Sequence, residues 1–506
     1  MILQPIHSFS VKFSKSLYYS SVISVNENGS EKSIEVRTHD IPVADAMSGF
    51  MKEGWAPSPL TGISAHSSIP FTKLRREKLS KQYVGKRLIF PSGSLKVRSN
   101  DSDYQYRAHS DFSWFTGLVA SDCVPDSLFV MEPTSAGHEA LLFIHPRSPR
   151  NDSEFYKDTR FGEFWVGRRM TLEETETKYG IKVKQIESIE EFLKDKKETL
   201  VVRGEDSAID KLVEENTESE KEFLNYISVM RAVKDKYEID EMQKAIDASV
   251  RGFADMVRVF PAATAVPRGE RVIEAAFYGR ARLEGNDNGY PSIVASGAHA
   301  CVLHWIKNDG DVLPGDLILI DAGVEVESHY TADITRTFPV NGKFTEAQRK
   351  IYMIDYKAQQ AGIAAVKPGA KFKDFHAACM VEIAKGAEEL GVLPISAEES
   401  LKEENGLHRR WQFHGSGHHL GIDVHDCAHA RKEQYAEAVL EAGMILTVEP
   451  GFYIQPDDTL FPEEYRGIGV RIEDDILVTE SGAKILSNAL PRHPDEVEAY
   501  MHKLII

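Results

Sequence analysis

The chain has 506 residues and a net charge of −18 at pH 7, with 42% hydrophobic and 27% charged residues. This length exceeds one compact core, so we expect two or three domains of ordinary soluble, globular composition. The acidic balance argues against nucleic acid as the main partner, because phosphate backbones require a basic face, and no apolar run approaches the roughly 20 residues that span a bilayer.

Residues 1–66 give the weakest structural signal. They contain no arginine before Arg37 and no apolar stretch that ends in a small-residue cleavage site, so neither a transit peptide nor a signal peptide is favoured. We expect an extension that is poorly ordered or loosely docked. The four cysteines of the chain show no paired spacing and no CxxC motif, which is typical of a reducing compartment and predicts a cytoplasmic location.

Residues 67–225 have the pattern of an N-terminal α/β domain. Short apolar runs bounded by turn residues predict strands at 87–90, 127–131, 140–144 and 199–202. The aromatic stretch YQYRAHSDFSWFTG, residues 104–117, is interpreted as core packing rather than as a binding surface.

A highly charged stretch marks the junction to a second domain, which we place at 226–506. Apolar residues at helical spacing over 205–245 predict helices, although a charge run of this kind is also typical of a solvated face. Asp235 is a candidate N-cap with Glu238 three residues later, so one helix should end near Val233 and another begin. Further helices are predicted at 242–259, 268–283, 346–365 and 373–390.

The second domain contains an internal repeat that places acids at the ends of strands. LPGDLILIDAG resembles LEAGMILTVEPG, and in each copy a glycine is followed six residues later by an acid, Asp321 or Glu449. A second acid follows each copy, Asp333 in the first and Glu473 in the second. Two duplicated halves related by a pseudo-two-fold axis would bring these four carboxylates together at the centre.

Asp321 and Asp333 form the first candidate pair. If the segments around them pair as antiparallel strands that turn near Glu327, the two aspartates face each other at about 4.5–5.5 Å between their Cβ atoms. Two buried carboxylates at this distance repel, and would hold a proton unless a cation lies between them. Two aspartates in surface turns would have the same spacing, so the pair alone leaves metal binding open.

A histidine-rich segment, HGSGHHLGIDVHD, adds an imidazole to these acids. Its glycines disfavour a helix, so His414 and His418 are not the helical pair of a zincin. In an extended segment, residues 414, 416 and 418 share one face while His419 points away. A lone histidine is usually an ordinary core or surface residue, but a glycine-spaced cluster between two acidic strand motifs indicates a site.

The combined set predicts a metal centre. It consists of four carboxylates and one imidazole: Asp321, Asp333, His418, Glu449 and Glu473. Four ionised carboxylates carry a charge of −4, which two divalent cations would balance. Oxygen-rich ligation suits Mn²⁺ or a similar hard cation, with Co²⁺, Fe²⁺ and Zn²⁺ still open.

Five motifs in this order closely resemble aminopeptidase P, the Xaa-Pro aminopeptidases of the pita-bread metallopeptidase family: HWIKNDG, DAGVEVESHYTADITRTFPVNG, HGSGHHLGIDVHD, TVEPGFY and YRGIGVRIEDD. The stretch at 104–117 also resembles part of that family's N-terminal domain. The resemblance implies an α/β (α+β) fold, in which an N-terminal α/β domain precedes a C-terminal pita-bread domain with duplicated, pseudo-two-fold halves.

The resemblance also implies how a dinuclear site would act. Asp321 and Asp333 would hold one metal ion with bridging Glu473, while Asp333, His418, Glu449 and Glu473 would hold the other. A bridging hydroxide would attack the peptide carbonyl before proline, with Glu449 as general base. The expected ion is Mn²⁺, and the expected substrates are peptides with proline in second position, from which the N-terminal residue is released.

Four further residues receive roles from the same resemblance. His304, His414 and His425 are expected to line the pocket, with His425 stabilising the oxyanion and His414 contacting the proline side. Arg471 is expected to orient the carboxylate ligands. A homo-oligomer, either a dimer or a tetramer, is expected as well.

Two other functions are open at this point. A prolidase shares the five ligands but hydrolyses only dipeptides, although the histidine-rich motif and the N-terminal motif are more similar to aminopeptidase P. A pita-bread domain can also serve as a non-catalytic binding module, and such relatives typically lose ligands. No ligand is lost in this chain.

Overall fold

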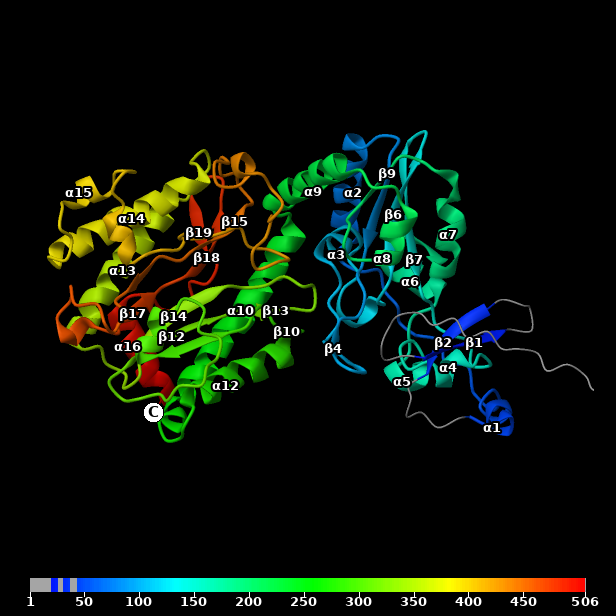
Figure 1. The fold of residues 1–506 in the computed structure, drawn as a ribbon, viewed down its shortest axis with the longest axis horizontal. Helices are drawn as coiled ribbons and strands as arrows, with labels where there is room; N and C mark the ends of the chain where they lie inside the picture. Colours follow the sequence, from blue (N-terminus) through cyan, green and yellow to red (C-terminus); the bar gives the residue numbers. More distant parts are fainter. Residues whose placement is uncertain (1–19, 26–30, 37–42, 506) are drawn as a thin grey trace, which may run out of the picture. The chain divides into compact units, whose positions relative to one another are not determined.

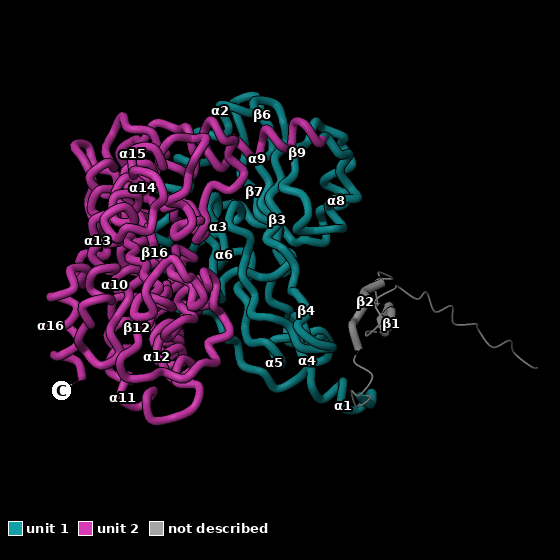
Figure 2. Tube along the Cα trace, turned by 60° about the vertical axis from the view of Figure 1, so that its left-hand side comes forward, with its two compact units in different colours: residues 1–216 teal, residues 217–506 magenta. Residues whose placement is uncertain are grey.

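The structure is a computed structural model that describes residues 20–25, 31–36 and 43–505 (Figure 1). It divides into two compact units, residues 1–216 and 217–506, which Figure 2 draws in different colours. The boundary proposed from sequence, 225/226, falls inside helix α9 (Thr217–Ala232). The charged residues that begin α9 mark a helix, but they give no signal for where the second unit starts.

A five-stranded mixed sheet with the order β8-β7-β6-β3-β9 is the centre of the first unit. Its strands are β3 (Arg87–Pro91), β6 (Leu128–Thr134), β7 (Gly137–Ile144), β8 (Lys182–Gln185) and β9 (Thr199–Val201). The β3–β9 and β7–β8 pairs are parallel and the other two are antiparallel. All four predicted strands are present, whereas β8 was not predicted because its sequence, KVKQ, is mostly polar.

Both faces of this sheet are buried. On one face Ile89 and Val130 pack with Ile209 of helix α8 (Ser207–Leu212). On the other face Phe90 contacts Phe115, with ring centroids 4.8 Å apart. Phe115 belongs to helix α3 (Ser110–Thr116), whose seven side chains are all buried. The predicted core role of the aromatic stretch is therefore confirmed for this helix.

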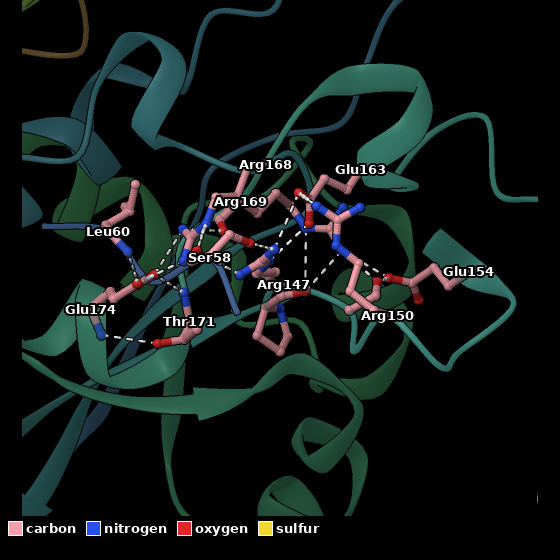
Figure 3. A network of polar contacts seen from close by, with 12 residues as sticks. Ser58, Leu60, Arg147, Arg150, Glu154, Glu163, Arg168, Arg169, Thr171 and Glu174 are labelled. Atoms are coloured by element: carbon pink, nitrogen blue, oxygen red, sulfur yellow. Dashed lines mark hydrogen bonds and ion pairs between the residues drawn. The ribbon is translucent and has the colours of Figure 1, made fainter. Parts of the chain in front are cut away.

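An arginine–glutamate network fastens the segment around Ser58 to the first unit (Figure 3). Arg147 and Arg168 both donate to the carbonyl oxygen of Ser58, at 3.0 and 3.2 Å. Glu174 accepts the backbone N–H of Leu60 at 2.9 Å while it binds Arg168 through both carboxylate oxygens. The extension expected over 1–66 is thus anchored near its C-terminal end, and residues 1–19, 26–30 and 37–42 lie outside the described residues.

The other described α-helices and strands of the first unit are short, apart from α2. They are β1 (Ser20–Val25), β2 (Glu31–Val36), α1 (Asp45–Phe50), α2 (Ile69–Gln82), β4 (Val97–Ser99), β5 (Ser102–Asp103), α4 (Glu154–Lys157), α5 (Glu163–Val166), α6 (Leu172–Tyr179) and α7 (Ile189–Phe192).

The second unit contains two halves of similar construction, each a pair of helices followed by a three-stranded antiparallel sheet (Figure 1). The first half consists of α10 (Lys236–Arg258), α12 (Gly269–Glu284), β11 (Ile293–Ser296), β12 (Leu317–Ala322) and β14 (Ile334–Pro339). The second half consists of α13 (Glu346–Ala365), α14 (Phe372–Glu389), β15 (Ile445–Val448), β18 (Asp474–Val478) and β19 (Ala483–Ile485). The four predicted helices are all present.

Backbone conformation repeats between the two halves as well. Gly315 and Gly443, which precede β12 and β15, have φ of +99° and +96°, a region that favours glycine.

Asp235 caps α10 by accepting the backbone N–H of Glu238, and the Glu238 side chain accepts the N–H of Asp235, as predicted. The remaining α-helices and strands are α11 (Phe260–Ala263), β10 (Asp287–Asn288), β13 (Val324–Glu325), α15 (Ala397–Ser400), β16 (Gly451–Tyr453), β17 (Gly469–Arg471) and α16 (Pro494–Ile505).

The predicted register between β12 and β14 is wrong by two residues. Asp321 pairs with Thr335 rather than with Asp333. The reason is the turn, in which the Val326 N–H donates to the carbonyl of Tyr330, so that the turn is centred on Ser328, one residue later than expected. A shift of two residues keeps a side chain on the same face of the sheet, so both aspartates still point to one side.

Among the described residues, none of the helices combines the length and apolar character that crossing a bilayer requires.

Candidate metal centre and active site

The four predicted carboxylates come from four different places in the second unit. Asp321 lies in β12, Asp333 immediately before β14, Glu449 immediately after β15, and Glu473 between β17 and β18. Asp321, Asp333 and Glu473 are all buried, and the Glu449 side chain is 16% exposed. Backbone pairing joins the two halves at this point, because the Glu473 N–H donates to the carbonyl of Thr335 at 3.1 Å.

The histidine-rich segment runs alongside β15 as an extended chain. The N–H of Thr447 donates to the carbonyl of His418, and the N–H of Glu449 donates to that of Ser416, at 2.9 and 3.0 Å. This pairing places His418 beside Glu449, and the predicted absence of a helix is confirmed. The His419 ring packs against Phe372 and Tyr435 with centroids 4.8 Å away.

The His418 imidazole faces the acids with its Nε2 atom. Nε2 lies 3.2 Å from Asp333 Oδ2 and 3.7 Å from Glu449 Oε1. Nδ1 lies 3.0 Å from the carbonyl oxygen of His419, a contact that assigns the ring proton to Nδ1 and the lone pair to Nε2. A lone pair that faces carboxylate oxygens is repelled unless a proton or a cation lies between them.

Burial and mutual repulsion disfavour four bare carboxylates. Burial raises the pKa of Asp321, raises that of Glu449 to about 7 and raises that of Glu473 well above its ordinary range. Burial opposes protonation of His418, but the hydrogen bond and charge of Asp333 outweigh it and raise the pKa of His418 to about 9. Protons would therefore occupy this cluster in the absence of cations.

The donor set fits divalent cations. One ligand atom each from Asp333, His418 and Glu473 lies within 4.8 Å of the other two. The Tyr290 hydroxyl lies 2.7 Å from Asp321 Oδ1 and 2.5 Å from Asp333 Oδ1, yet it has only one proton to donate. The carboxylate oxygens therefore have too few hydrogen-bond donors around them. Together with the imidazole lone pair they form the oxygen-rich environment that hard cations occupy.

Arg471 and the hydroxyl groups of Thr335 and Tyr453 form a hydrogen-bond network that supports this cluster. Arg471 donates to Asp321 Oδ2 at 2.6 Å, to the Tyr453 hydroxyl at 3.0 Å and to Thr335 Oγ1 at 3.2 Å. Thr335 Oγ1 in turn donates to Glu473 Oε2 at 2.7 Å. The buried guanidinium therefore contacts one predicted ligand directly and a second through Thr335.

Of the three predicted pocket histidines, His414 and His425 lie next to residues of this cluster. His414 Nε2 lies 2.8 Å from the Tyr453 hydroxyl, and the His425 ring lies 4.4 Å from the His418 ring at 86°. Burial, followed by the charge of Arg471, lowers the pKa of His414 to about 4, and burial, followed by the charge of His418, lowers the pKa of His425; His304 makes a smaller contribution to both shifts. His304 and His425 are themselves exposed.

Three polar neighbours of the ligands were not predicted from the sequence: Tyr290, Thr335 and Tyr453. Their roles depend on which residues the fold places opposite the acids, and hydroxyl residues are too common to mark a site. The only available signals were positional. Thr335 lies two residues after Asp333, and Tyr453 four residues after Glu449, so each shares a short segment with a predicted ligand.

Two family models match the chain. Residues 72–202 match the aminopeptidase P N-terminal domain, and residues 240–480 match metallopeptidase family M24. Either domain boundary, 216/217 or 225/226, falls between these matches. Fold and site thus define an M24 metallopeptidase that carries an aminopeptidase P N-terminal domain, a class that uses divalent metal ions.

Comparison with individual proteins shows which members of this class the chain is similar to. The chain is 48% identical over 465 residues to Xaa-Pro aminopeptidase 1 of Streptomyces coelicolor, which covers 91% of this chain and 93% of that protein. It is 32% identical over 464 residues to the Xaa-Pro aminopeptidase of Escherichia coli, covering 87% and 99%. Similar solved structures include Pseudomonas aeruginosa aminopeptidase PepP and zinc-substituted E. coli aminopeptidase P in complex with product, each with a TM-score of 0.75 at 30% identity over 87% of this chain and 99% of that one.

The chain belongs to the Xaa-Pro aminopeptidase (aminopeptidase P) family and is a metalloaminopeptidase. The fold class and the resemblance inferred from the motifs are confirmed.

Proposed function

We propose that this chain is a dinuclear-metal-dependent enzyme that releases the N-terminal residue from peptides with proline in second position. One observation carries the proposal: Asp333, Glu449 and Glu473, from both halves of the second unit, gather around the Nε2 lone pair of His418, in a chain of the Xaa-Pro aminopeptidase family. Asp321 joins them through the Tyr290 hydroxyl, which contacts both Asp321 and Asp333. Named Xaa-Pro aminopeptidases among the relatives support the substrate class.

The proposed ligands divide into two overlapping sets. Asp321 and Asp333 would hold one divalent cation together with Glu473, and Asp333, His418, Glu449 and Glu473 would hold the second. The oxygen-rich set favours Mn²⁺. Two such cations, when bound, would polarise the scissile carbonyl and lower the pKa of a water molecule.

Glu449 is the proposed general base. Its side chain is 16% exposed, against 11% for Asp321 and 7% for Asp333, so it is the carboxylate best placed to receive a proton from the solvent side. Arg471 and Thr335 would keep Asp321 and Glu473 oriented throughout the reaction through the hydrogen bonds described above.

Three histidines would act on the substrate. His425 is exposed beside the His418 ring, which suits a donor that stabilises the oxyanion at the scissile carbonyl. His414, hydrogen-bonded to Tyr453, would contact the proline side of the peptide. His304 would line the same pocket, and its effect on the pKa of both other histidines supports this position.

Three further properties belong to the same proposal. We propose manganese as the working ion, a homo-oligomer (dimer or tetramer) as the assembly and the cytoplasm as the location. The cysteine pattern supports a reducing compartment, because all four cysteines are free and buried. A prolidase is less well supported, since the relatives reported above are Xaa-Pro aminopeptidases over nearly the full chain.

The experiment that tests the proposal compares two substrates with metal-stripped enzyme, with and without added Mn²⁺. We expect metal-dependent release of the first residue from an Xaa-Pro-Xaa tripeptide. Cleavage of an Xaa-Pro dipeptide alone would instead identify a prolidase. Cleavage of neither substrate with any divalent ion would leave a binding module as the better description.

A further inference from the structure

A single buried carboxylate collects four hydrogen bonds from the loop that carries His304. Glu270 is the second residue of α12 and is fully buried. Its Oε1 accepts the Ser296 N–H at 2.8 Å and lies 2.8 Å from His299 Nδ1. Its Oε2 accepts the Trp305 indole N–H at 2.8 Å and the Gly310 N–H at 2.7 Å. These donors span residues 296–310, which we call the His304 loop.

The His304 loop is built to fit this anchor. The His299 and Trp305 rings stack with centroids 3.8 Å apart, so both side chains reach Glu270 from one side. A Cβ atom on Gly310 would lie 2.8 Å from Glu270 Oε1 and 2.6 Å from the His299 ring, so only glycine allows this approach. One helix turn further along α12, Glu274 accepts the Asn308 amide at 2.9 Å.

His304 depends on this anchor for its position. Its side chain is exposed and makes no hydrogen bond to any of the residues that the structure describes. The neighbouring side chains Leu303 and Trp305 pack against a buried cluster that includes Tyr453. The hydroxyl group of Tyr453 forms hydrogen bonds with both Arg471 and His414. The backbone of the loop, rather than contacts of its own, therefore fixes His304 relative to the active site.

We infer that Glu270 is a positioning residue for catalysis, which acts through the His304 loop to hold His304 against the substrate. The inference rests on the proposed function, because it takes His304 as part of the peptide-binding pocket. Glutamine at position 270 keeps the size of the side chain but replaces one acceptor oxygen with an NH₂ group. The backbone N–H on that side, that of Ser296 or of Gly310, would then face another donor and lose its hydrogen bond.

The test is a double-mutant cycle with Mn²⁺-loaded full-length enzyme and an Xaa-Pro-Xaa tripeptide. Glu270→Gln should lower kcat/KM at least tenfold in the wild-type background, but less than threefold in a His304→Ala background. Glu284→Gln is the matched control, since Glu284 lies at the other end of α12 and pairs with Arg251 and Arg280. The control should keep kcat/KM within twofold.

A second readout needs neither metal nor activity. Hydrogen exchange at one of the two loop amides, Ser296 or Gly310, whichever faces the NH₂ group, should speed up in Glu270→Gln while exchange in the rest of α12 stays unchanged. If Glu270→Gln does not fold, Trp305→Phe replaces it in both measurements, because it removes one donor and keeps the aromatic stack with His299.

Several results would overturn the inference. Unchanged loop exchange or unchanged kcat/KM in Glu270→Gln would do so, as would a double variant whose loss equals the product of the two single losses. The last result would describe Glu270 as a general structural anchor. Absence of tripeptide cleavage by the wild-type chain would instead defeat the proposed function itself, which separates the two failures.

Discussion

At the residue scale, substitution of Glu449 tests the proposed catalytic chemistry most directly. Glu449→Gln removes the proposed general base and one ligand oxygen, so we expect kcat/KM for the tripeptide to fall about a thousandfold or more. Glu480→Gln, an exposed acid in the turn after β18, should leave kcat/KM unchanged. Glu449→Gln activity within tenfold of wild type would remove Glu449 from the mechanism.

Glu174 gives a pH-dependent prediction in the first unit. Arg168 and the backbone N–H groups of Thr171 and Leu60 lower the pKa of this carboxyl to about 2. A lowered folded-state pKa stabilises the protein above the unfolded value of about 4.3 and loses that contribution as the pH falls toward 2. Glu174→Gln should thus cost on the order of 1–2 kcal/mol of unfolding free energy at pH 7.

The difference between wild type and Glu174→Gln should shrink as the pH is lowered from 5 to 3. Urea titrations of both proteins at several pH values measure it. A difference that stays constant over this range would mean that Glu174 stabilises the unit through shape alone, without a contribution from its charge.

At the element scale, the histidine-rich segment must lie flat against β15 to bring His418 beside Glu449. Gly417 has φ of +155°, and a Cβ atom there would lie 2.1 Å from the carbonyl oxygen of Thr447. Gly417→Ala should therefore push the segment off the strand and lower kcat/KM at least tenfold, a loss measurable with the tripeptide assay.

Gly415 offers a matched control two residues away. A Cβ atom at this position meets nothing within 4 Å, and its φ is not in the left-handed region. Gly415→Ala should keep kcat/KM within about twofold of wild type, because an exposed substitution without strain has little effect. Equal losses in both variants would show that the segment is sensitive to any side chain and would contradict the pairing argument.

The elements also show where sequence reasoning stops. Helical periodicity and strand-ending acids identified α10, α12, α13, α14 and the repeat, because these patterns follow directly from which faces are buried. The register of β12 against β14 was predicted two residues off, since it depends on a turn geometry at Val326–Tyr330 that composition does not specify. The acids remained on one face only because the error was an even number.

The supporting contacts between distant segments, unlike the gathering of the ligands, could not be predicted. The arginine–glutamate network joins Ser58 and Leu60 to residues about a hundred positions later in the chain. Arginines and glutamates of this kind are common on any protein surface, so the sequence gives no signal for the contact. Tyr290 contacts Asp321 and Asp333 from a third segment, and this contact could not be predicted either, because a tyrosine in the sequence does not mark a site. Ligand types were readable from the sequence, whereas the groups that orient them required the fold.

At the scale of the whole molecule, the buried acids tie metal binding to stability. Protons must leave Glu473 and Asp321 when cations bind, so Mn²⁺ should raise the Tm of metal-stripped enzyme at pH 7 by several degrees. Asp333→Asn should abolish most of this rise, as seen by thermal unfolding with and without Mn²⁺. The same rise in Asp333→Asn would place the stabilising ion elsewhere.

The most direct test of the central claim is the number of metal ions that activity requires. Metal-stripped enzyme is titrated with Mn²⁺ while cleavage of the Xaa-Pro-Xaa tripeptide and bound manganese per chain are measured together. Four carboxylates and one imidazole predict full activity at two equivalents per chain. Full activity at one equivalent, or activity without any bound divalent ion, would contradict a dinuclear centre.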